Sequence, residues 1–318
     1  MTGESSTAVA ARYGSLAVVR EIFRNAGVQG WVHARCFGCA GENGLDADEP
    51  VVLASVVKVP LVLEFARQVA AGQLDPADRV RVRAADRLGG VGTAGCFDDV
   101  ELSLRDAAFF ALTLSDNTAA DLLFDRVGLD NVRSLVRELG LTETRIAGAP
   151  RDIVQSMADD IGARDAAEFA ARFATLGAAA VLGSRALDPR RSTASTPREM
   201  TRLLTLIGQD LAGPAQACRW VRDVMREQVN WYRLAAAFPP EAQIWAKTGT
   251  LPGVRNEIGV IEYPDGSRYA VAVFTRTESL VQRLPEVDRA IGAAAVAAID
   301  GIVHGLPYTT SHGRCGGS

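Results

Sequence analysis

Residues 243–276 read QIWAKTGTLPGVRNEIGVIEYPDGSRYAVAVFTR, and this stretch decides the fold. Apolar, β-branched and aromatic residues recur through 243–249, 255–263 and 268–275, which predicts three strands. The Tyr-Pro-Asp-Gly-Ser turn at 263–267 indicates that the last two strands form a hairpin. The sequence therefore predicts an antiparallel meander in the last third of the chain.

Helical patterns surround this meander. Residues 7–25 predict an N-terminal helix, 28–37 alternate like a strand, and 285–303 predict a closing Ala-rich helix. A polar stretch at 41–50 reads as a turn region. The long middle of the chain is mostly helical, with helix patterns at 55–72, 103–114, 118–139 (with Asp130 as a possible N-cap), 151–180, 196–211 and 214–229.

This order predicts an α/β plus all-α architecture. We expect an α/β sheet domain built from residues 1–54 and 230–318, in which N- and C-terminal helices flank an antiparallel sheet. A helical domain of residues 55–229 would be inserted into it, with the active site between the two.

The composition excludes several classes of protein. The chain has 318 residues and a net charge of −4, with no basic block, so we expect no nucleic-acid partner. No apolar run is long enough to span a bilayer, and residues 1–27 lack the pattern of a secretory signal. We expect a cytoplasmic protein that acts on a small molecule and needs no metal or other cofactor; the sequence does not indicate an oligomeric state.

The basic residues are divided very unevenly. Of 34 Lys and Arg residues, only Lys58 and Lys247 are lysines, which leaves 32 arginines. Arginine cannot act as a neutral amine near neutral pH, whereas a buried lysine can. The two lysines are therefore the first candidates for chemistry.

Ser55 and Lys58 form a Ser-x-x-Lys motif at the start of a predicted helix. Residues three apart share a helix face, so the amine can reach the hydroxyl, and a buried lysine can lose its proton and act as a base. Helix N-termini also offer N–H groups to an oxyanion. A cap serine followed by a surface lysine is the alternative interpretation.

Two further motifs carry polar groups. Ser115-Asp116-Asn117 offers a hydroxyl that can relay a proton and an amide that can hold a carbonyl, although all three residue types are also good helix caps. Lys247-Thr248-Gly249-Thr250 ends a predicted strand, where the glycine allows a substrate backbone to approach and the lysine offers a compact charge. A plain strand-end turn is the alternative for this motif.

Together the three motifs resemble the S-x-x-K, S-D-N and K-T-G set of class A β-lactamases and penicillin-binding proteins. The resemblance extends over roughly residues 15–300. Segments similar to the family, in the family's order, are GQLDPADRV (72–80), LSLRDAAFFALTLSDNTAADLLFDRVG (102–128), STPREM (195–200) and KTGTLPGVRNEIGVI (247–261).

The resemblance implies a role for each matching position. Ser55 would be the acylated serine, Lys58 the proton acceptor and Ser115 the proton relay. The strand lysine would be Lys247, and the N–H groups of Ser55 and Thr250 would form the oxyanion hole. The substrate-binding positions would be Asn117, Thr248, Gly249 and Thr250.

One family feature has no match in the sequence. Class A enzymes carry a Glu-x-x-Leu-Asn segment whose glutamate directs water for deacylation. Between 145 and 196 the one glutamate is Glu168, and its context differs. Asp152 could orient water but is also typical of a helix cap. The interval also has extra helical residues around 150–195, which we expect to reshape the edge of the site. Which group resolves an acyl-enzyme is left open by the sequence.

Several functions fit these observations. The sequence favours an intracellular, biosynthetic serine hydrolase or acyltransferase that forms an acyl-enzyme from an ester, thioester, amide or β-lactam. Alternatives are a class A-type β-lactamase with an atypical deacylation group, a serine-dependent glutaminase, and a non-catalytic ligand-binding homologue. Arg255 and Arg276 are weak candidates for binding a substrate carboxylate, and Cys36 and Cys39 are expected to be plain thiols.

Overall fold

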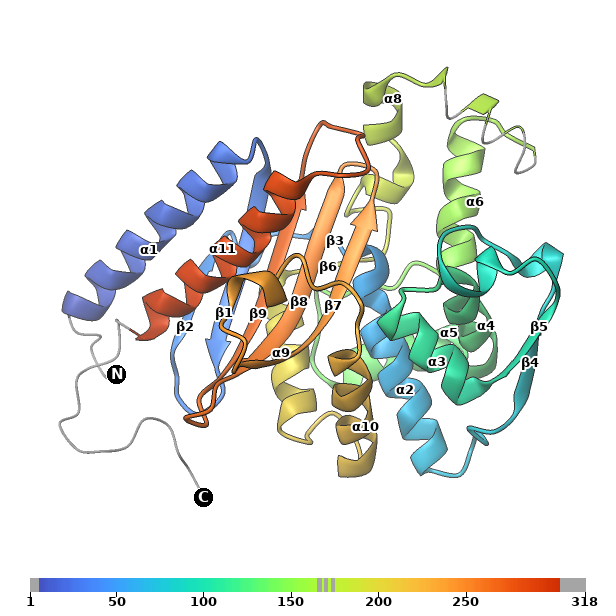
Figure 1. Cartoon of the computed structure of the whole chain (residues 1–318), viewed down its shortest axis with the longest axis horizontal. Helices are drawn as coiled ribbons and strands as arrows, with labels where there is room; N and C mark the ends of the chain where they lie inside the picture. The colour runs from blue at the N-terminus through green and yellow to red at the C-terminus, as the bar shows by residue number, and fades with distance from the viewer. Residues whose placement is uncertain (1–5, 165–167, 169–170, 173–174, 304–318) are drawn as a thin grey trace.

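The computed structural model describes residues 6–164, 168, 171–172 and 175–303 (Figure 1). Its centre is an antiparallel sheet, and the predicted meander forms three of the adjacent strands through antiparallel pairing. In spatial order the strands are β2 (Glu42–Leu45), β1 (Gln29–Cys36), β9 (Arg268–Arg276), β8 (Val254–Glu262) and β7 (Gln243–Leu251).

The edge strand β2 corrects one expectation, because residues 41–50 were predicted as a turn region. Asn43 lies within β2 and is buried, and its amide donates hydrogen bonds to Ser15 Oγ and to the Ala298 carbonyl. These two partners come from the two terminal helices. Contacts distant in sequence therefore hold a polar segment in the sheet.

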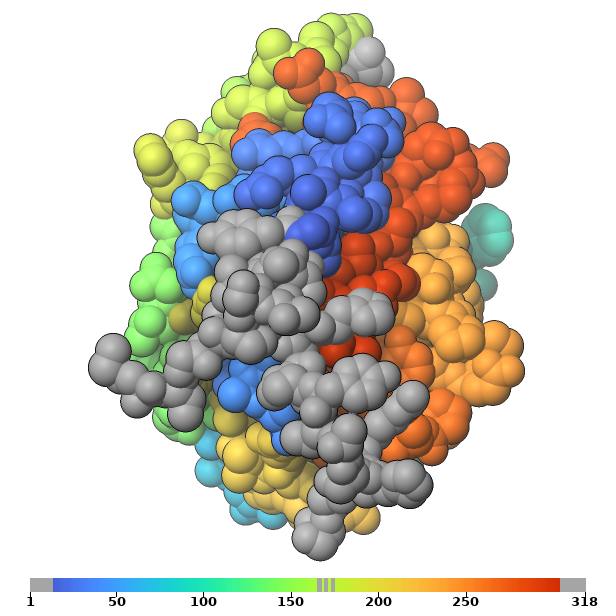
Figure 2. Space-filling model, turned by 90° about the vertical axis from the view of Figure 1, so that its left-hand side faces the viewer, coloured from blue at the N-terminus to red at the C-terminus, as the bar shows by residue number. Residues whose placement is uncertain are grey.

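Helices cover both faces of the sheet. The helices α1 (Ser6–Asn25) and α11 (Pro285–Val303) lie side by side on one face, as Figures 1 and 2 show. The other face packs against α9 (Pro197–Gly208) and α10 (Ala215–Arg226). The predicted β-lactamase-like fold, an antiparallel sheet with flanking terminal helices, is confirmed.

The remaining helices gather around α2 (Lys58–Ala70), most of whose residues are buried, including Val59, Leu61, Leu63 and Phe65. Its neighbours in this helical region are α3 (Leu104–Thr113), α4 (Asn117–Val127) and α5 (Leu129–Glu138). The smaller elements are β3 (Val51–Val52) paired with β6 (Ala194–Ser195), β4 (Arg79–Val82) paired with β5 (Val100–Ser103), α6 (Pro150–Asp160) and α8 (Ala178–Leu182).

One predicted helix is two helices in the structure. The pattern at 118–139 divides into α4 and α5 at Gly128, whose φ of 86° is open to glycine and ends the first helix. Gly128 is thus the N-cap of α5, and Asp130 lies in its first turn. The proposed division into two domains stays a prediction; α9 and α10, which belong to its helical part, pack directly on the sheet.

Candidate active site

Ser55 lies at the junction between the small β3–β6 pair and α2. Residues Ala54–Val57 form a short 3₁₀ helix that packs against β7, and the α-helix begins only at Lys58. Ala54 has a φ of 51°, a left-handed conformation that is uncommon for a residue with a side chain. Such conformations often occur where a fold fixes a functional group, and here the next residue is the candidate nucleophile.

Lys58 is 1% exposed, and its amine is surrounded by the Ser-Asp-Asn motif. Lys58 Nζ donates to the Ser115 carbonyl at 2.7 Å and to Asn117 Oδ1 at 2.6 Å, and it lies 3.4 Å from Ser115 Oγ. Burial lowers the pKa of Lys58 to about 7, although the nearby Asp116 carboxylate opposes the shift. The amine is therefore partly neutral near neutral pH.

Within the Ser-Asp-Asn motif, one residue caps a helix and the other two contact Lys58. Asp116 is the helix cap: its carboxylate accepts the Ala119 N–H of α4 at 3.0 Å and the Thr93 N–H at 2.6 Å. Ser115 has a φ of 60°, and this backbone turn directs its carbonyl and hydroxyl to Lys58. The cap interpretation thus holds for Asp116, while Ser115 and Asn117 contact the lysine.

The second lysine lies on β7 and is fully buried. Lys247 Nζ donates to the Thr248 carbonyl at 2.9 Å. Burial lowers the pKa of Lys247 well below its usual range, and the charges of Lys58 and Arg233 lower it further, against the effect of Glu257. The two lysines of the chain therefore interact electrostatically in one site. A substrate carboxylate placed here would favour the charged amine.

Gly249 and Thr250 lie where β7 passes the serine segment. A Cβ added to Gly249 would be 2.7 Å from the Leu53 carbonyl oxygen and 3.3 Å from the Ala54 Cβ. The glycine is thus required by close approach of two backbones. Thr250 follows it on β7, the strand that packs against the 3₁₀ helix containing Ser55, and its side chain is exposed.

Three residues at this site were missed from the sequence. Arg233 is 1% exposed, donates to Thr250 Oγ1 at 2.9 Å and to the Gly249 carbonyl at 3.2 Å, and pairs with Asp288. Asn230 donates to Thr248 Oγ1 at 2.9 Å. The third is the fully buried Glu257, whose pKa is raised by burial.

The arginines considered from the sequence are engaged elsewhere. Arg255 is buried and donates to both Asp288 carboxylate oxygens, at 3.0 and 3.1 Å, and to the Gln282 carbonyl. Arg276 donates to the Leu182 carbonyl at 3.1 Å. Arg233, which does contact the site, was not considered, because nothing in the sequence distinguishes it from the other arginines among the 32 in the chain.

The described residues between 146 and 193 form an excursion, which we call the 146–193 excursion, and contacts of Arg145 close its base. Arg145 pairs with Ala194 as an isolated β-bridge, and its guanidinium donates to the Pro189 and Ser192 carbonyls at 2.9 and 2.7 Å. Asp152 accepts the Ala149 N–H at 2.8 Å and caps α6. Glu168 forms ion pairs with Arg164 and Arg172.

Two general features complete the description. Within the ranges that the structure describes, no three His, Cys, Asp or Glu side chains gather in a way that could hold a metal ion. In those same ranges, no helix combines the length and apolar character needed to cross a membrane.

Comparisons with known proteins identify the family of this chain. The model of the Beta-lactamase enzyme family matches residues 17–302, and the chain belongs to this family. A β-lactamase from Sphaerobacter thermophilus superposes with a TM-score of 0.72 at 26% identity, over 93% of this chain and 98% of that one.

Other relatives differ in what their names say. The Beta-lactamase regulatory protein BlaB of Streptomyces cacaoi is 28% identical over 277 residues, 82% of this chain and 88% of the relative. The class A β-lactamase of Mycobacterium abscessus is 20% identical, with a TM-score of 0.72 over 90% of this chain and 98% of that one, a likeness of fold alone.

Proposed function

We propose that this protein is a serine hydrolase or acyltransferase that forms an acyl-enzyme at Ser55. The observation that carries the proposal is the buried Lys58 amine, whose pKa is lowered to about 7 and which lies one helical turn after Ser55. A lysine kept neutral in this way is suited to accept a proton from a serine hydroxyl.

In the proposed acylation step, Lys58 Nζ takes the proton of Ser55 Oγ, and the oxygen attacks the substrate carbonyl carbon. The N–H groups of Ser55 and Thr250 would stabilise the resulting oxyanion. Ser115 Oγ would pass a proton from the Lys58 ammonium to the leaving group as the carbonyl re-forms, and the 3.4 Å separation of these two atoms supports that relay. Asn117 would then hold the substrate while also orienting Lys58.

The surroundings of the site support a substrate that carries a carboxylate and an apolar group. Arg233 supplies a cationic side chain beside Thr250, and Lys247 supplies an amine beside Thr248 that a bound carboxylate would favour in its charged form. Val91 and Trp231 are 63% and 61% exposed. The residues before them, Gly90 and Asn230, adjoin Asn117 and Thr248, so these apolar side chains would flank the entrance on both sides.

The groups available for deacylation support a long-lived acyl-enzyme. In the described part of 146–193, Asp152 is used as a helix cap and Glu168 in ion pairs with two arginines. A water-directing carboxylate must instead face the acyl group with a lone pair unoccupied. We therefore propose that acylation of Ser55 is faster than hydrolysis, and that an amine acceptor could compete with water.

The proposal is tested by intact-mass measurement of the protein with a penicillin, a cephalosporin and an activated ester, alongside product formation. The expected result is an adduct of the acyl mass that persists for minutes, accompanied by slow product release. The matched control is Ser55→Ala, which should form no adduct. An equal reaction of Ser55→Ala with any of the three compounds would contradict the proposal, and fast turnover of the β-lactams would instead support a β-lactamase with an atypical deacylation group.

A second candidate is a binding protein that holds its ligand without catalysis. It is favoured by the name of the Streptomyces cacaoi relative, a β-lactamase regulatory protein. The mass experiment together with a calorimetric titration separates the two, because this candidate predicts saturable binding of a β-lactam with no adduct on Ser55.

A further inference from the structure

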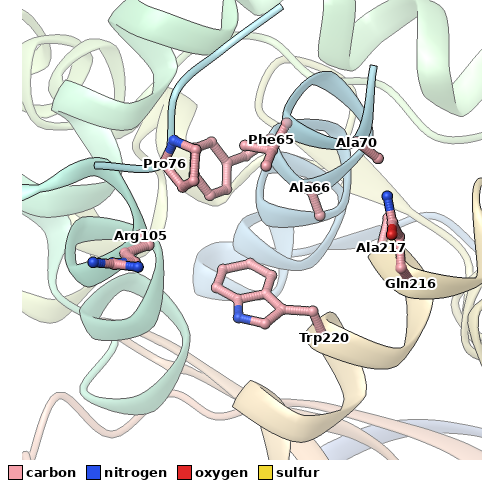
Figure 3. A pocket seen from close by; sticks show the side chains of 9 residues that line it. Phe65, Ala66, Ala70, Pro76, Arg105, Gln216, Ala217 and Trp220 are labelled. Carbon is pink, nitrogen blue, oxygen red and sulfur yellow. The ribbon is translucent and has the colours of Figure 1, made fainter. Parts of the chain in front are cut away.

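A cavity separate from the candidate active site lies between the C-terminal half of α2, the turn that follows α2, the start of α3 and the start of α10. We call it the α2–α10 cavity. Its volume is about 360 Å³, within the range of about 300–1,000 Å³ usual for small-molecule sites. Phe65, Val69 and Trp220 line it, and the Phe65 and Trp220 ring centroids are 5.8 Å apart at a 57° tilt (Figure 3).

Two polar side chains lie on opposite sides of this apolar space, Arg105 from α3 and Gln216 from α10 (Figure 3). Among the residues that the structure describes, neither the Arg105 guanidinium nor the Gln216 amide has a hydrogen-bond or ionic partner in the protein. Some other exposed arginines pair with a carboxylate, such as Arg79 with Glu101 and Arg81 with Asp99. An unpaired guanidinium beside aromatic rings leaves its fork of donors open to a carboxylate.

We propose that the α2–α10 cavity binds a small aryl or alkyl carboxylate. The apolar part would lie beside the buried Phe65 ring and against the half-buried Trp220, because covering the exposed part of the indole and of the ligand removes apolar surface from water. The carboxylate would pair with Arg105, and Gln216 would offer a second polar contact. This binding requires no acyl-enzyme at Ser55, so it stands or fails independently of the proposed function.

The test uses the full-length protein and the probe pair 4-phenylbutyrate and 4-phenylbutyramide, which differ in charge but hardly in shape. Binding is measured by calorimetry and by tryptophan fluorescence, since Trp220 lies in the cavity. We expect the carboxylate to bind at least about tenfold more tightly than the amide, a difference of about 1.4 kcal/mol. Equal binding of acid and amide, or no binding of either, would overturn the proposal.

Variants then locate the site. Arg105→Gln should weaken binding of the acid about tenfold, whereas Arg219→Gln should leave it within about twofold. Arg219 is the matched control because it is an exposed arginine on α10 that does not line the cavity. Ala70→Phe should abolish binding by filling the space, with folding checked by circular dichroism. Unchanged binding in Arg105→Gln would overturn the assignment even if Ala70→Phe failed to fold.

Discussion

The region around Ser55 and Lys58 and the 146–193 excursion differ in the environment of their charged side chains. Lys58 is buried without a directly paired carboxylate, and its pKa is lowered from 10.5 to about 7, which corresponds to roughly 5 kcal/mol in favour of the neutral amine. In the excursion, Glu168 and its arginine partners are ion-paired near solvent, where such pairs contribute little. The fold therefore buries the proposed acylating base, whereas the described residues of the excursion hold Asp152 in a helix cap and Glu168 in ion pairs.

The largest effect that would break this comparison comes from Lys58→Arg. A guanidinium stays charged at any working pH, so it cannot accept the serine proton, and we expect acylation of Ser55 to slow by about 10³-fold. The measurement is the rate of adduct formation by rapid-quench mass spectrometry. Arg67→Lys, a swap in the opposite direction on the same helix, is the control and should acylate normally; acylation by Lys58→Arg within tenfold of wild type would refute the role of Lys58.

Gly249→Ala tests the close approach of β7 to the serine segment. The new Cβ would be 2.7 Å from the Leu53 carbonyl oxygen, so the strand must move away from Ser55 and separate the two proposed oxyanion donors. We expect acylation to slow by about 10²-fold and the free energy of unfolding to fall by about 1–3 kcal/mol.

Gly95→Ala is the matched control for this strand variant, because a Cβ at Gly95 would meet no atom within 4 Å. It should change neither the acylation rate nor the melting temperature appreciably. A normal rate in Gly249→Ala would mean that Thr250 does not contribute an oxyanion donor from this strand.

The site residues that could be predicted from the sequence are those that lie close together along the chain or belong to a rare residue type. Ser55 and Lys58 are three residues apart, and Lys247 stands out because lysine is so rare in this chain. Arg233 could not be found in this way, because its value depends on Thr250 and Asp288, which lie 17 and 55 positions further along the chain. Its contacts exist only after the sheet and α11 have packed.

The same reasoning applies to the fold. The meander and the two terminal helices follow from periodicity and from one turn, and their bounds were nearly right. The edge strand β2 could not be predicted, since its polar residues form a strand only when β1 and the terminal helices supply partners. The 3₁₀ helix that contains Ser55 likewise packs against β7, a contact that the local sequence does not indicate.

The pH dependence of the acylation rate tests the role of Lys58 through a smaller effect than the substitutions. The active form of Lys58 is the neutral amine, and its pKa is about 7. The acylation rate should therefore rise about tenfold per pH unit below that value and level off above it. A rate constant measured from pH 5.5 to 9 with a non-ionisable activated ester gives this curve. A flat profile, or a rise only above pH 10, would show that Lys58 is not the titrating base.

The smallest effects are expected in the excursion itself. Asp152→Asn should leave the hydrolysis rate of the acyl-enzyme within about twofold, while the lost carboxylate at the start of α6 lowers stability by about 0.5–1 kcal/mol. Glu168→Gln should also leave hydrolysis unchanged, because its carboxylate is held by Arg164 and Arg172. Pre-formed acyl-enzyme, isolated from excess substrate and followed by mass, measures deacylation alone. A fall of tenfold or more in either variant, with the acylation rate intact, would identify that carboxylate as the water-directing group and remove the contrast between the two regions.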